Sequence, residues 1–239
     1  MLGIGHGIQT NTVGLTEIFR NNYSILLDGV NDYIDTDTVA GNVDEDKGTV
    51  SMWIKFNGAT SVNNVFWKAT VDSNNQIFMM YLNSTQKFRF AHKGGGTQAQ
   101  ADVSTSEEGD GNWTHIAITW NTGDDELKGY VNGSQVGGTQ SSLGTFSGTI
   151  DECYIGTNTL AANQFFKGYV DEVSVFSEVV SIASLYNAGD PKNVEFSGLA
   201  GLEGYWRFTE GTGTSIVDES GNSNTGTLVN GAAWSAVTI

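Results

Sequence analysis

Apolar and polar residues alternate along most of the chain that follows residue 22. The stretch WTHIAITW at 113–120 is the clearest case, because every second residue falls on the same side. A period of two is typical of a strand with one buried face. Related apolar stretches lie at 49–56, 76–82 and 87–92. Pairs such as Asn57-Gly58 and Asn132-Gly133 mark tight turns, so the pattern predicts many short antiparallel strands.

One short helix is predicted near residues 179–187. The stretch VVSIASLY carries apolar residues at helical spacing, and Gly189 followed by Pro191 ends it. Many strands with a single helix predict an all-β, two-sheet antiparallel sandwich over residues 22–239. Residues 1–21 lack this periodicity, and we expect them to form an N-terminal arm.

The chain is strongly acidic, with 27 Asp and Glu against 11 Lys and Arg and a formal net charge of −16. Such a surface repels nucleic acid and anionic membranes, whereas it suits cation binding. Cys153 is the only cysteine, so no intrachain disulfide can form. No stretch is long enough for membrane insertion, and the first residues lack the features of a signal peptide. We therefore expect a protein made in a cytoplasm without a signal peptide.

The sequence contains no motif of a known active site. His6, His92 and His115 are far apart, without metal-type spacing, and neither G-x-S-x-G nor a phosphate-binding loop is present. Most acidic clusters lie in turn-like stretches, where solvated charge is the expected role. Adjacent carboxylates on one strand, as at Asp171-Glu172, are expected to point to opposite faces and so cannot flank one sugar bond. We expect the protein not to be an enzyme.

Asp171 stands out within FKGYVDEVSVF, residues 166–176. Alternation predicts that it shares a face with Val173 and Val175, and that Glu172 shares the other face with Ser174. A carboxylate on the more apolar side needs a partner, because an unpaired buried charge is destabilising. Catalysis, a metal and a hydrogen-bonded core position are the alternatives.

An ordered set of blocks resembles a known superfamily: YSILLDGVNDYI, GTVSMWIKF, WTHIAITW, GYVNGSQV, FKGYVDEVSVF and GYWRFTEGTGTSIVDESGNSNTGTL. Together, over about residues 22–236, they resemble the laminin G-like, concanavalin A-like lectin/glucanase superfamily. The resemblance implies a jelly-roll sandwich of two curved antiparallel sheets.

The resemblance also implies a metal site. In the glucanase branch, a late strand carries an Asp that resembles Asp171 and binds a structural calcium ion. A backbone carbonyl near an early corner, here around Asp28 and Gly29, completes part of that site. We predict one structural Ca²⁺ with Asp171, Asp28 and Asp32 as ligands, since calcium prefers oxygen ligands. The alternative is that acidic residues in turn-like segments, including 218–224, hydrogen-bond their own turns.

Hydrolysis is not implied by the resemblance. The glucanase branch uses an E-x-D-x-x-E strand, whose nearest counterpart here is Glu108-Gly109-Asp110. Trp113 stands where the second Glu should be. We therefore expect no glycoside hydrolysis.

The order of the blocks looks circularly permuted, because the GYWRF block closes the chain. This order resembles that of phage and marine-virus structural proteins. It implies a non-catalytic, virion-associated decoration or fibre protein that docks on capsid or tail proteins, as a possible homo-oligomer. The N-terminal arm would be its anchor. A free carbohydrate-binding lectin is the alternative, and a glycoside hydrolase is a third.

Trp53 and Arg89 are the candidates for glycan binding. Each falls on the more polar side of its strand, and a sugar-binding face presents aromatic and polar groups. Ordinary surface or edge packing is the alternative for both residues.

Overall fold

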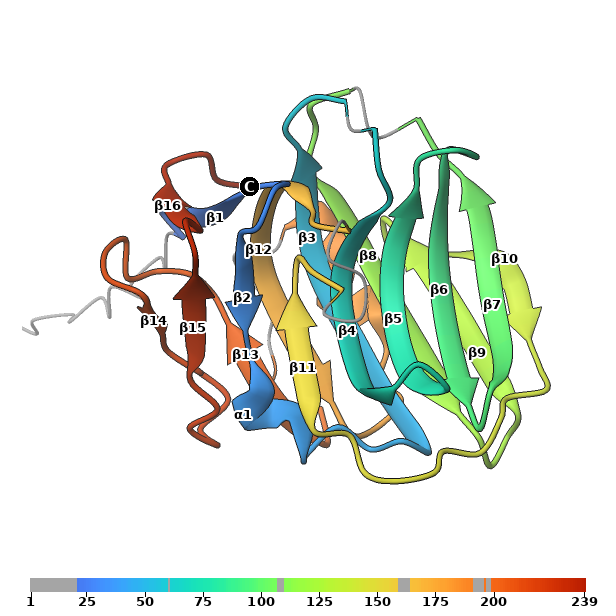
Figure 1. Ribbon diagram of the computed structural model, residues 1–239. Coiled ribbons are helices and arrows are strands. Elements are labelled where there is room, and N and C mark those ends of the chain that lie inside the picture. Colours follow the sequence, from blue (N-terminus) through green and yellow to red (C-terminus); the bar gives the residue numbers. More distant parts are fainter. Residues whose placement is uncertain (1–20, 60, 107–109, 159–163, 191–195, 197–198) are drawn as a thin grey trace, which may run out of the picture.

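Two antiparallel sheets of eight strands each pack face to face (Figure 1). The computed structural model describes residues 21–59, 61–106, 110–158, 164–190, 196 and 199–239. Within these residues, the predicted all-β jelly-roll sandwich is confirmed.

The back sheet, which lies behind in Figure 1, is built around the long strands β3 and β12. In spatial order it contains β10 (Ser134–Gln140), β9 (Glu126–Val131), β8 (Thr114–Asn121), β3 (Lys47–Phe56), β12 (Lys167–Phe176), β1 (Ser24–Asp28) and β16 (Ala233–Ser235), and β13 (Leu202–Trp206) also pairs with β12.

The front sheet ends in three hairpins that run consecutively in sequence. In spatial order it contains β14 (Ser215–Ile216), β15 (Gly226–Val229), β2 (Tyr33–Asp35), β11 (Glu152–Ile155), β4 (Asn64–Asp72), β5 (Asn75–Leu82), β6 (Lys87–Gly94) and β7 (Thr97–Ser104). Its outer face is turned toward the viewer in Figure 1.

The main core lies between the two sheets. Met52 and Ile54 of β3 and Ile116 and Ile118 of β8 point into it at every second position. A group of aromatic rings fills one part, with neighbouring centroids 5.0–6.4 Å apart: Phe56, Phe66, Tyr81, Phe88 and Phe166. Burial of each such side chain contributes roughly 1.5–3 kcal/mol, so the alternation seen in the sequence is what holds the sheets together.

The two ends of the described chain meet at one edge of the sandwich (Figure 1). β1 pairs with β16, the Ser24 hydroxyl donates to the Val237 carbonyl over 2.6 Å, and the Tyr23 ring packs edge-on against Trp234. The closing block supplies β13 beside β12 and β15 beside β2. A permuted block order requires such neighbouring ends. Except for its last residue, the predicted arm at 1–21 lies outside the described residues.

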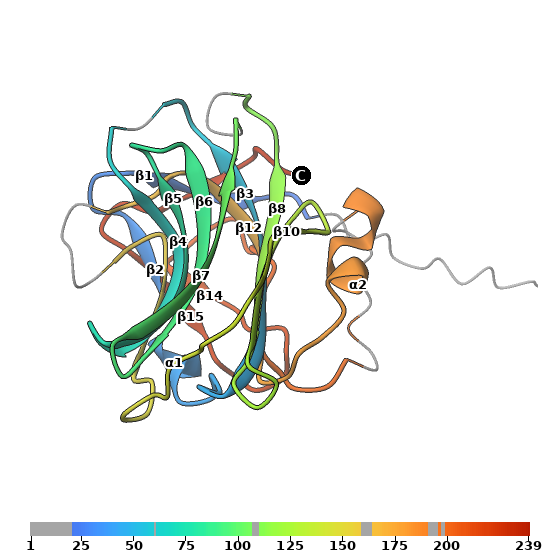
Figure 2. The same ribbon diagram turned by 90° about the vertical axis from the view of Figure 1, so that its right-hand side faces the viewer.

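A short helix, α2 (Ile182–Tyr186), covers part of the outer face of the back sheet (Figure 2). Its Ile182 and Leu185 are buried against Ala117 and Phe176 of the sheet. This confirms the predicted helix, although it begins later and continues as a 3-10 turn, η2 (Asn187–Gly189). A single-turn helix, α1 (Asp37–Ala40), was not predicted. Among the helices described, none is long and apolar enough to cross a membrane.

Candidate functional site

A β-bulge in β12 brings the carboxylates of Asp171 and Glu172 together. Asp171 pairs with Trp53 of β3, but the next paired residue, Ser174, lies opposite Ser51, so β12 holds one residue more than its partner. Glu172 takes a left-handed backbone conformation with φ 48°. One amide nitrogen, Asn21 Nδ2, donates to Asp171 Oδ1 over 2.6 Å and to Glu172 Oε1 over 3.3 Å.

The bulge corrects the expectation that the two carboxylates point to opposite faces. Val173 and Val175 lie in the core between the sheets, whereas Asp171 does not share their face. A bulge shifts the alternation by one residue, so the period of two no longer predicts orientation beyond it.

The carboxylate cluster comprises Asp171, Glu172, Asn21, Tyr205 and Arg207. The Tyr205 hydroxyl donates a short hydrogen bond to Glu172. Arg207 Nε lies 3.5 Å from Glu172 Oε1. Asn21 Nδ2 also donates to the Arg207 backbone carbonyl over 2.7 Å, which ties the start of the described chain to β12 and to the end of β13.

The two carboxyl groups of the cluster differ in how readily they ionise. Burial raises the pKa of Asp171 well above its usual range, and the charge of Glu172 adds to this rise. Burial also raises the pKa of Glu172 to about 6, while the hydrogen bond from Tyr205 and the charge of Arg207 oppose the rise. Neighbouring carboxylates disfavour double ionisation. At neutral pH we therefore expect Asp171 to be protonated and Glu172 to balance Arg207.

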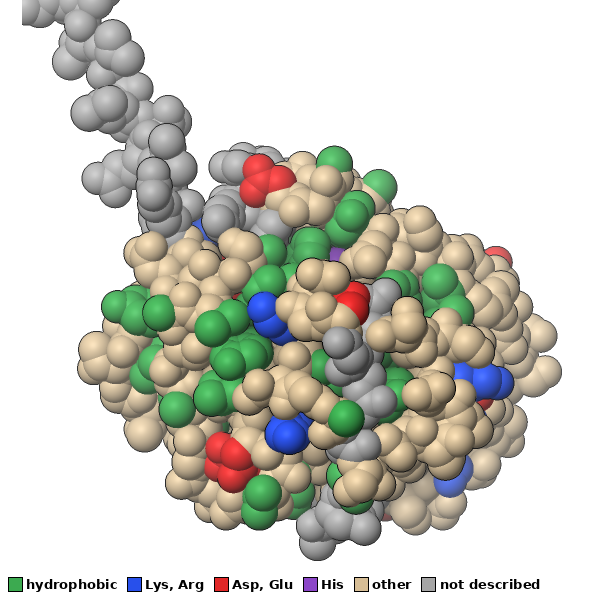
Figure 3. Space-filling model, turned by 90° about the horizontal axis from the view of Figure 1, so that it is seen from above, with side chains coloured by type: hydrophobic (Ala, Val, Ile, Leu, Met, Phe, Trp, Pro, Cys, Tyr) green, Lys and Arg blue, Asp and Glu red, His purple; other side chains and the backbone are tan. Residues whose placement is uncertain are grey.

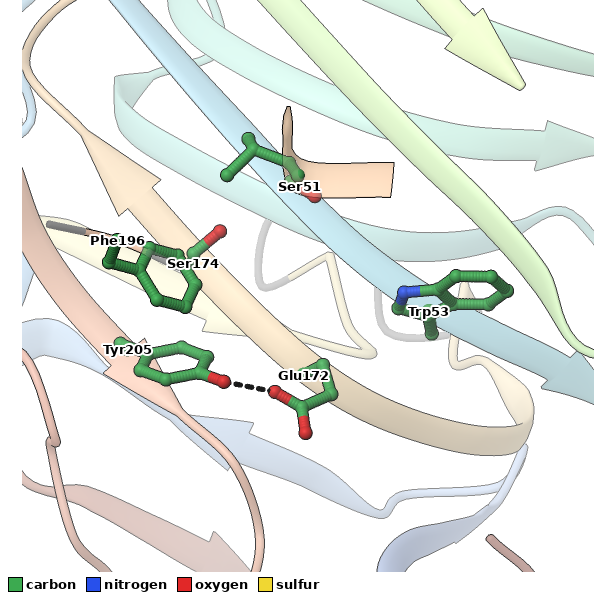
Figure 4. A pocket seen from close by; sticks show the side chains of 7 residues that line it. Ser51, Trp53, Glu172, Ser174, Phe196 and Tyr205 are labelled. Carbon is green, nitrogen blue, oxygen red and sulfur yellow. Dashed lines mark hydrogen bonds between the residues drawn. The ribbon is translucent and has the colours of Figure 1, made fainter. Parts of the chain in front are cut away.

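The pocket beside this cluster is too small for a substrate (Figure 4). Its volume is about 10 Å³, enough for about one water molecule. Figure 4 shows Glu172 and Tyr205 linked by their hydrogen bond, with Ser51 and Trp53 on the neighbouring strand. Such a closed, hydrogen-bonded arrangement is typical of a structural polar network.

A Ser-His pair lies on the same face without the remaining parts of a catalytic site. Ser51 Oγ lies 2.7 Å from His115 Nε2, and burial lowers the pKa of His115 to about 3. Within the described part of the chain, His115 Nδ1 has no hydrogen-bond partner. A nucleophilic serine needs a base that accepts a proton near neutral pH and a third group that orients it, so this pair lacks both.

Trp53, one of the two predicted glycan-binding residues, lies in this closed region. It is 5% exposed and stacks on Tyr186 of α2, with centroids 5.9 Å apart. His115 contacts its ring edge. In this arrangement the ring is not open to a glycan.

The predicted calcium ligands do not converge. Asp28 pairs with Lys167 of β12, which is four residues from Asp171, or about 13 Å along the strand. Asp32 accepts the Asp28 backbone N–H over 3.2 Å, and Asp28 Oδ1 accepts N–H groups of its own turn. In the part of the chain that the structure describes, no group of three or more His, Cys, Asp or Glu side chains could hold a metal. The acidic side chains visible in Figure 3 are likewise scattered.

The segment at 218–224 also uses its oxygens internally. Asp218 accepts from the backbone N–H groups of Tyr205, Ser220 and Asn224, at 2.8–2.9 Å. These residues therefore fit the turn-forming alternative. The three proposed calcium ligands do not form one donor set, and the calcium prediction stays a prediction for measurement in solution.

A larger pocket, of about 270 Å³, lies on the outer face of the front sheet. We call it the front pocket; it is lined by Asn63, Val65, Lys68, Gln76, Phe78, Met80, Leu82, Arg89, Asn158 and Gln164. Its floor is apolar, because Val65, Phe78 and Met80 pack into a cluster separate from the main core. An apolar patch with polar groups around it is a frequent form of ligand site.

Arg89, the second predicted glycan-binding residue, does line the front pocket. Its guanidinium makes a two-pronged ion pair with Asp102 of β7, through Nε and Nη2 at 2.8 Å each. This pair fixes the position of the guanidinium and leaves further N–H donors for a ligand.

Lys68 is one of the residues of the front pocket that the sequence did not point to. It is 1% exposed, its ammonium donates to Asn158 Oδ1 over 2.6 Å, and burial lowers its pKa to about 8. Asn158 in turn donates to Gln164 Oε1 over 2.7 Å. One sequence signal pointed to this face. Phe78 and Met80 lie on the side of their strand that faces away from the main core, where a sheet with one exposed face usually carries polar residues.

With this geometry established, comparison with known families gives one match. Residues 28–185 match the model of the concanavalin A-like lectin/glucanases superfamily. The chain belongs to this superfamily. The match covers most of the chain, from the last residue of β1 into α2, and confirms the family inferred from the sequence blocks. Comparison with curated protein sequences gives no match.

Solved structures share the concanavalin A-like fold at low sequence identity. A Bacteroides ovatus protein that is proposed to bind carbohydrate has a TM-score of 0.60 and 18% identity, over 90% of this chain and 59% of that one. This chain therefore spans about three fifths of that relative.

Two further structures are modules of glycoside-processing enzymes. Domain 4 of a GH43 arabinanase from Geobacillus stearothermophilus, in complex with arabinotriose, has a TM-score of 0.56 and 18% identity, over 70% of this chain and 76% of that one. The CBM40 module of a Ruminococcus gnavus IT-sialidase, bound to α2,6-sialyllactose, has a TM-score of 0.55 and 14% identity, over 70% and 96%. At these identities the likeness shows the fold alone.

Proposed function

We propose that this chain is a non-catalytic carbohydrate-binding protein and that the front pocket is its binding surface. The observation that carries the proposal is the combination of an apolar floor at Phe78 and Met80 with a rim of amide and cationic side chains. Sugars present C–H faces to apolar side chains and hydroxyl groups to polar ones. The front pocket offers both kinds of contact on one open face.

The lining of the front pocket supports binding without catalysis. Among the described residues that line it, none is Asp or Glu. Glycoside hydrolysis uses two carboxyl groups across one bond. Asp171 and Glu172 lie on the other sheet, and the pocket that Glu172 lines has room for about one water molecule. Sugar complexes of two modules with the same fold, one with arabinotriose and one with sialyllactose, are consistent with this role.

The proposal is tested by glycan binding with matched variants. The purified chain is applied to a glycan array, and each glycan that binds is titrated by calorimetry. Phe78→Ser removes the largest apolar contact of the floor, and we expect affinity to fall about tenfold. Val30→Ser is the control, since Val30 is an exposed apolar residue on the β1–β2 turn. If Phe78→Ser fails to fold, Phe78→Leu removes the ring and keeps apolar volume.

Two outcomes would overturn the proposal. In one, no glycan binds the folded protein. In the other, the Phe78 variants bind as tightly as the parent chain.

The setting of this binding is a separate proposal. The block order resembles that of virion structural proteins, and the meeting of β1 with β16 is consistent with a permuted order. We propose a decoration or fibre protein on a virion, docked on capsid or tail proteins, and a free lectin fits the same observations. Mass spectrometry of purified particles tests this: absence of the chain would favour the free lectin. Deletion of residues 1–20 tests the arm as the anchor.

A further inference from the structure

Lys68 is a buried cation that lacks a paired anion among the described residues. The residue is 1% exposed, and its ammonium donates to a neutral oxygen, Asn158 Oδ1. Among the described residues, no carboxylate lies within ion-pair distance of it. A buried charge is ordinarily paired, because desolvation is costly.

Other cations of the chain differ from Lys68 in this respect. Lys47 pairs with Glu178 and Lys128 pairs with Glu126 at the surface. Arg89, in the same pocket, is neutralised by Asp102. In a chain with 27 acidic and 11 basic residues, carboxylates are abundant. Lys68 therefore brings to the front pocket a positive charge that no ion pair among the described residues balances.

The surroundings of Lys68 explain both its position and its incomplete pairing. It lies on β4 between Phe78 of β5 and Tyr154 of β11 in register. The Tyr154 hydroxyl donates to Asp37 Oδ2 over 3.1 Å. The charge of Glu152 on β11 opposes the lowering of the Lys68 pKa by burial. An ammonium has three donors, and Asn158 takes one of them.

We propose that the front pocket binds a carboxylate-bearing sugar and that Lys68 recognises its carboxylate. This inference rests on the proposed function and names its ligand class. An incoming carboxylate supplies the missing counter-ion at an already desolvated ammonium, where charge-assisted hydrogen bonds are strong. The apolar floor then contacts the sugar ring. Asp102 already balances the charge of Arg89, so the remaining N–H donors of Arg89 would hydrogen-bond hydroxyl groups of the sugar.

The test compares sugars that differ only at the carboxyl group. Uronate-containing oligosaccharides and their carboxyl-reduced counterparts are titrated against the parent chain at pH 7. We expect the acidic form to bind about ten- to a hundredfold more tightly, the range for a hydrogen bond to a charged group. Lys68→Met keeps the length and removes the charge, so it should abolish this preference. Lys68→Arg should retain it, and Lys128→Met should leave it unchanged.

A pH series provides a readout that a purely structural role of Lys68 would not move. The pKa of Lys68 is about 8, so affinity for the acidic sugar should fall as the pH rises through and above this value. The other charged groups around the ammonium are Glu152, Asp37 beyond Tyr154, and the Arg89–Asp102 pair. Lys68→Arg should remove this pH dependence, because a guanidinium stays charged.

The outcomes separate this inference from the proposed function. Equal binding of acidic and reduced sugars refutes the role of Lys68 and leaves carbohydrate binding intact. A preference for acidic sugars that survives in folded Lys68→Met also refutes it. If neither form binds at any concentration, the inference fails, and the proposed function fails with it only if no other glycan of the array binds the folded protein.

Discussion

Replacement of Asp171 by Asn and by Ala distinguishes a protonated, hydrogen-bonded side chain from an ionised one. Asp171 accepts from Asn21 Nδ2 over 2.6 Å and from the Glu172 backbone N–H over 2.9 Å. Asp171→Asn keeps an acceptor at that position and mimics the neutral carboxyl. Asp171→Ala removes the acceptor of the Glu172 backbone N–H, whereas Asn21 Nδ2 keeps Glu172 Oε1 and the Arg207 carbonyl as acceptors. One unsatisfied buried donor costs about 1–3 kcal/mol, so Asp171→Ala should lower the free energy of unfolding by about that amount. Near pH 4, before the pH-dependent decline described below sets in, Asp171→Asn should change it by less than about 1 kcal/mol.

The pH dependence of the same variants gives a second, signed expectation. The pKa of Asp171 is raised on folding, so the folded chain binds more protons than the unfolded chain between the two pKa values. The stabilisation that this group contributes is therefore fully present at pH values below its pKa in the unfolded chain, near 3.9. It is lost as the pH rises toward the folded pKa, by about 1.4 kcal/mol for each unit of pKa elevation. Asp171→Asn should remove this part of the decline.

Urea denaturation, followed by tryptophan fluorescence from pH 4 to pH 8, measures both effects. Calcium and a chelator are included at each pH, because the predicted metal site requires an ionised Asp171. If Asp171→Asn destabilises the protein as much as Asp171→Ala does, the inference that Asp171 is protonated is wrong. A calcium-dependent rise in stability that Asp171→Asn abolishes would support the metal site instead.

Three further predictions concern the sandwich and its two faces. Gly129→Ala should destabilise the protein by about 1–3 kcal/mol, because a Cβ there would lie 2.3 Å from Phe90 Cδ2 of the facing sheet. Gly41→Ala is its control, since nothing lies within 4 Å of a Cβ placed at Gly41 and the φ of Gly41 is −66°. Equal melting temperatures for the two variants would contradict the close packing of Gly129 against Phe90. Trp53→Phe should leave glycan affinity unchanged in calorimetry, because the ring is stacked under Tyr186; a tenfold loss, about 1.4 kcal/mol, would contradict this. Incubation with β-glucans should release no reducing sugar, and release that is lost in Glu172→Gln would contradict the structural role of the carboxylate cluster.

The sequence was sufficient for the fold because its information is local. Alternation in β3 and β8 predicted the strands, and the stop at Gly189 predicted the end of the helical segment. The side of Arg89 on its strand was also predictable, and the structure places it in the front pocket.

The carboxylate cluster was not predictable because it depends on pairing between distant strands. The extra residue in β12 exists only relative to β3, and no local signal marks Glu172 as a left-handed residue. The separation of Asp28 from Asp171 likewise follows from the register of β1 against β12. Lys68 acquires its buried position from β5, β11 and Asn158, which lies ninety residues away in the sequence.

The most direct test of carbohydrate binding at the front sheet is a crystal structure with an oligosaccharide selected from the array. We predict that a sugar ring lies over Phe78 and Met80, with its polar groups within hydrogen-bond distance of Arg89 or Lys68. A sugar bound elsewhere, for example in the pocket between the sheet edges beside Val103 and Val136, would contradict it.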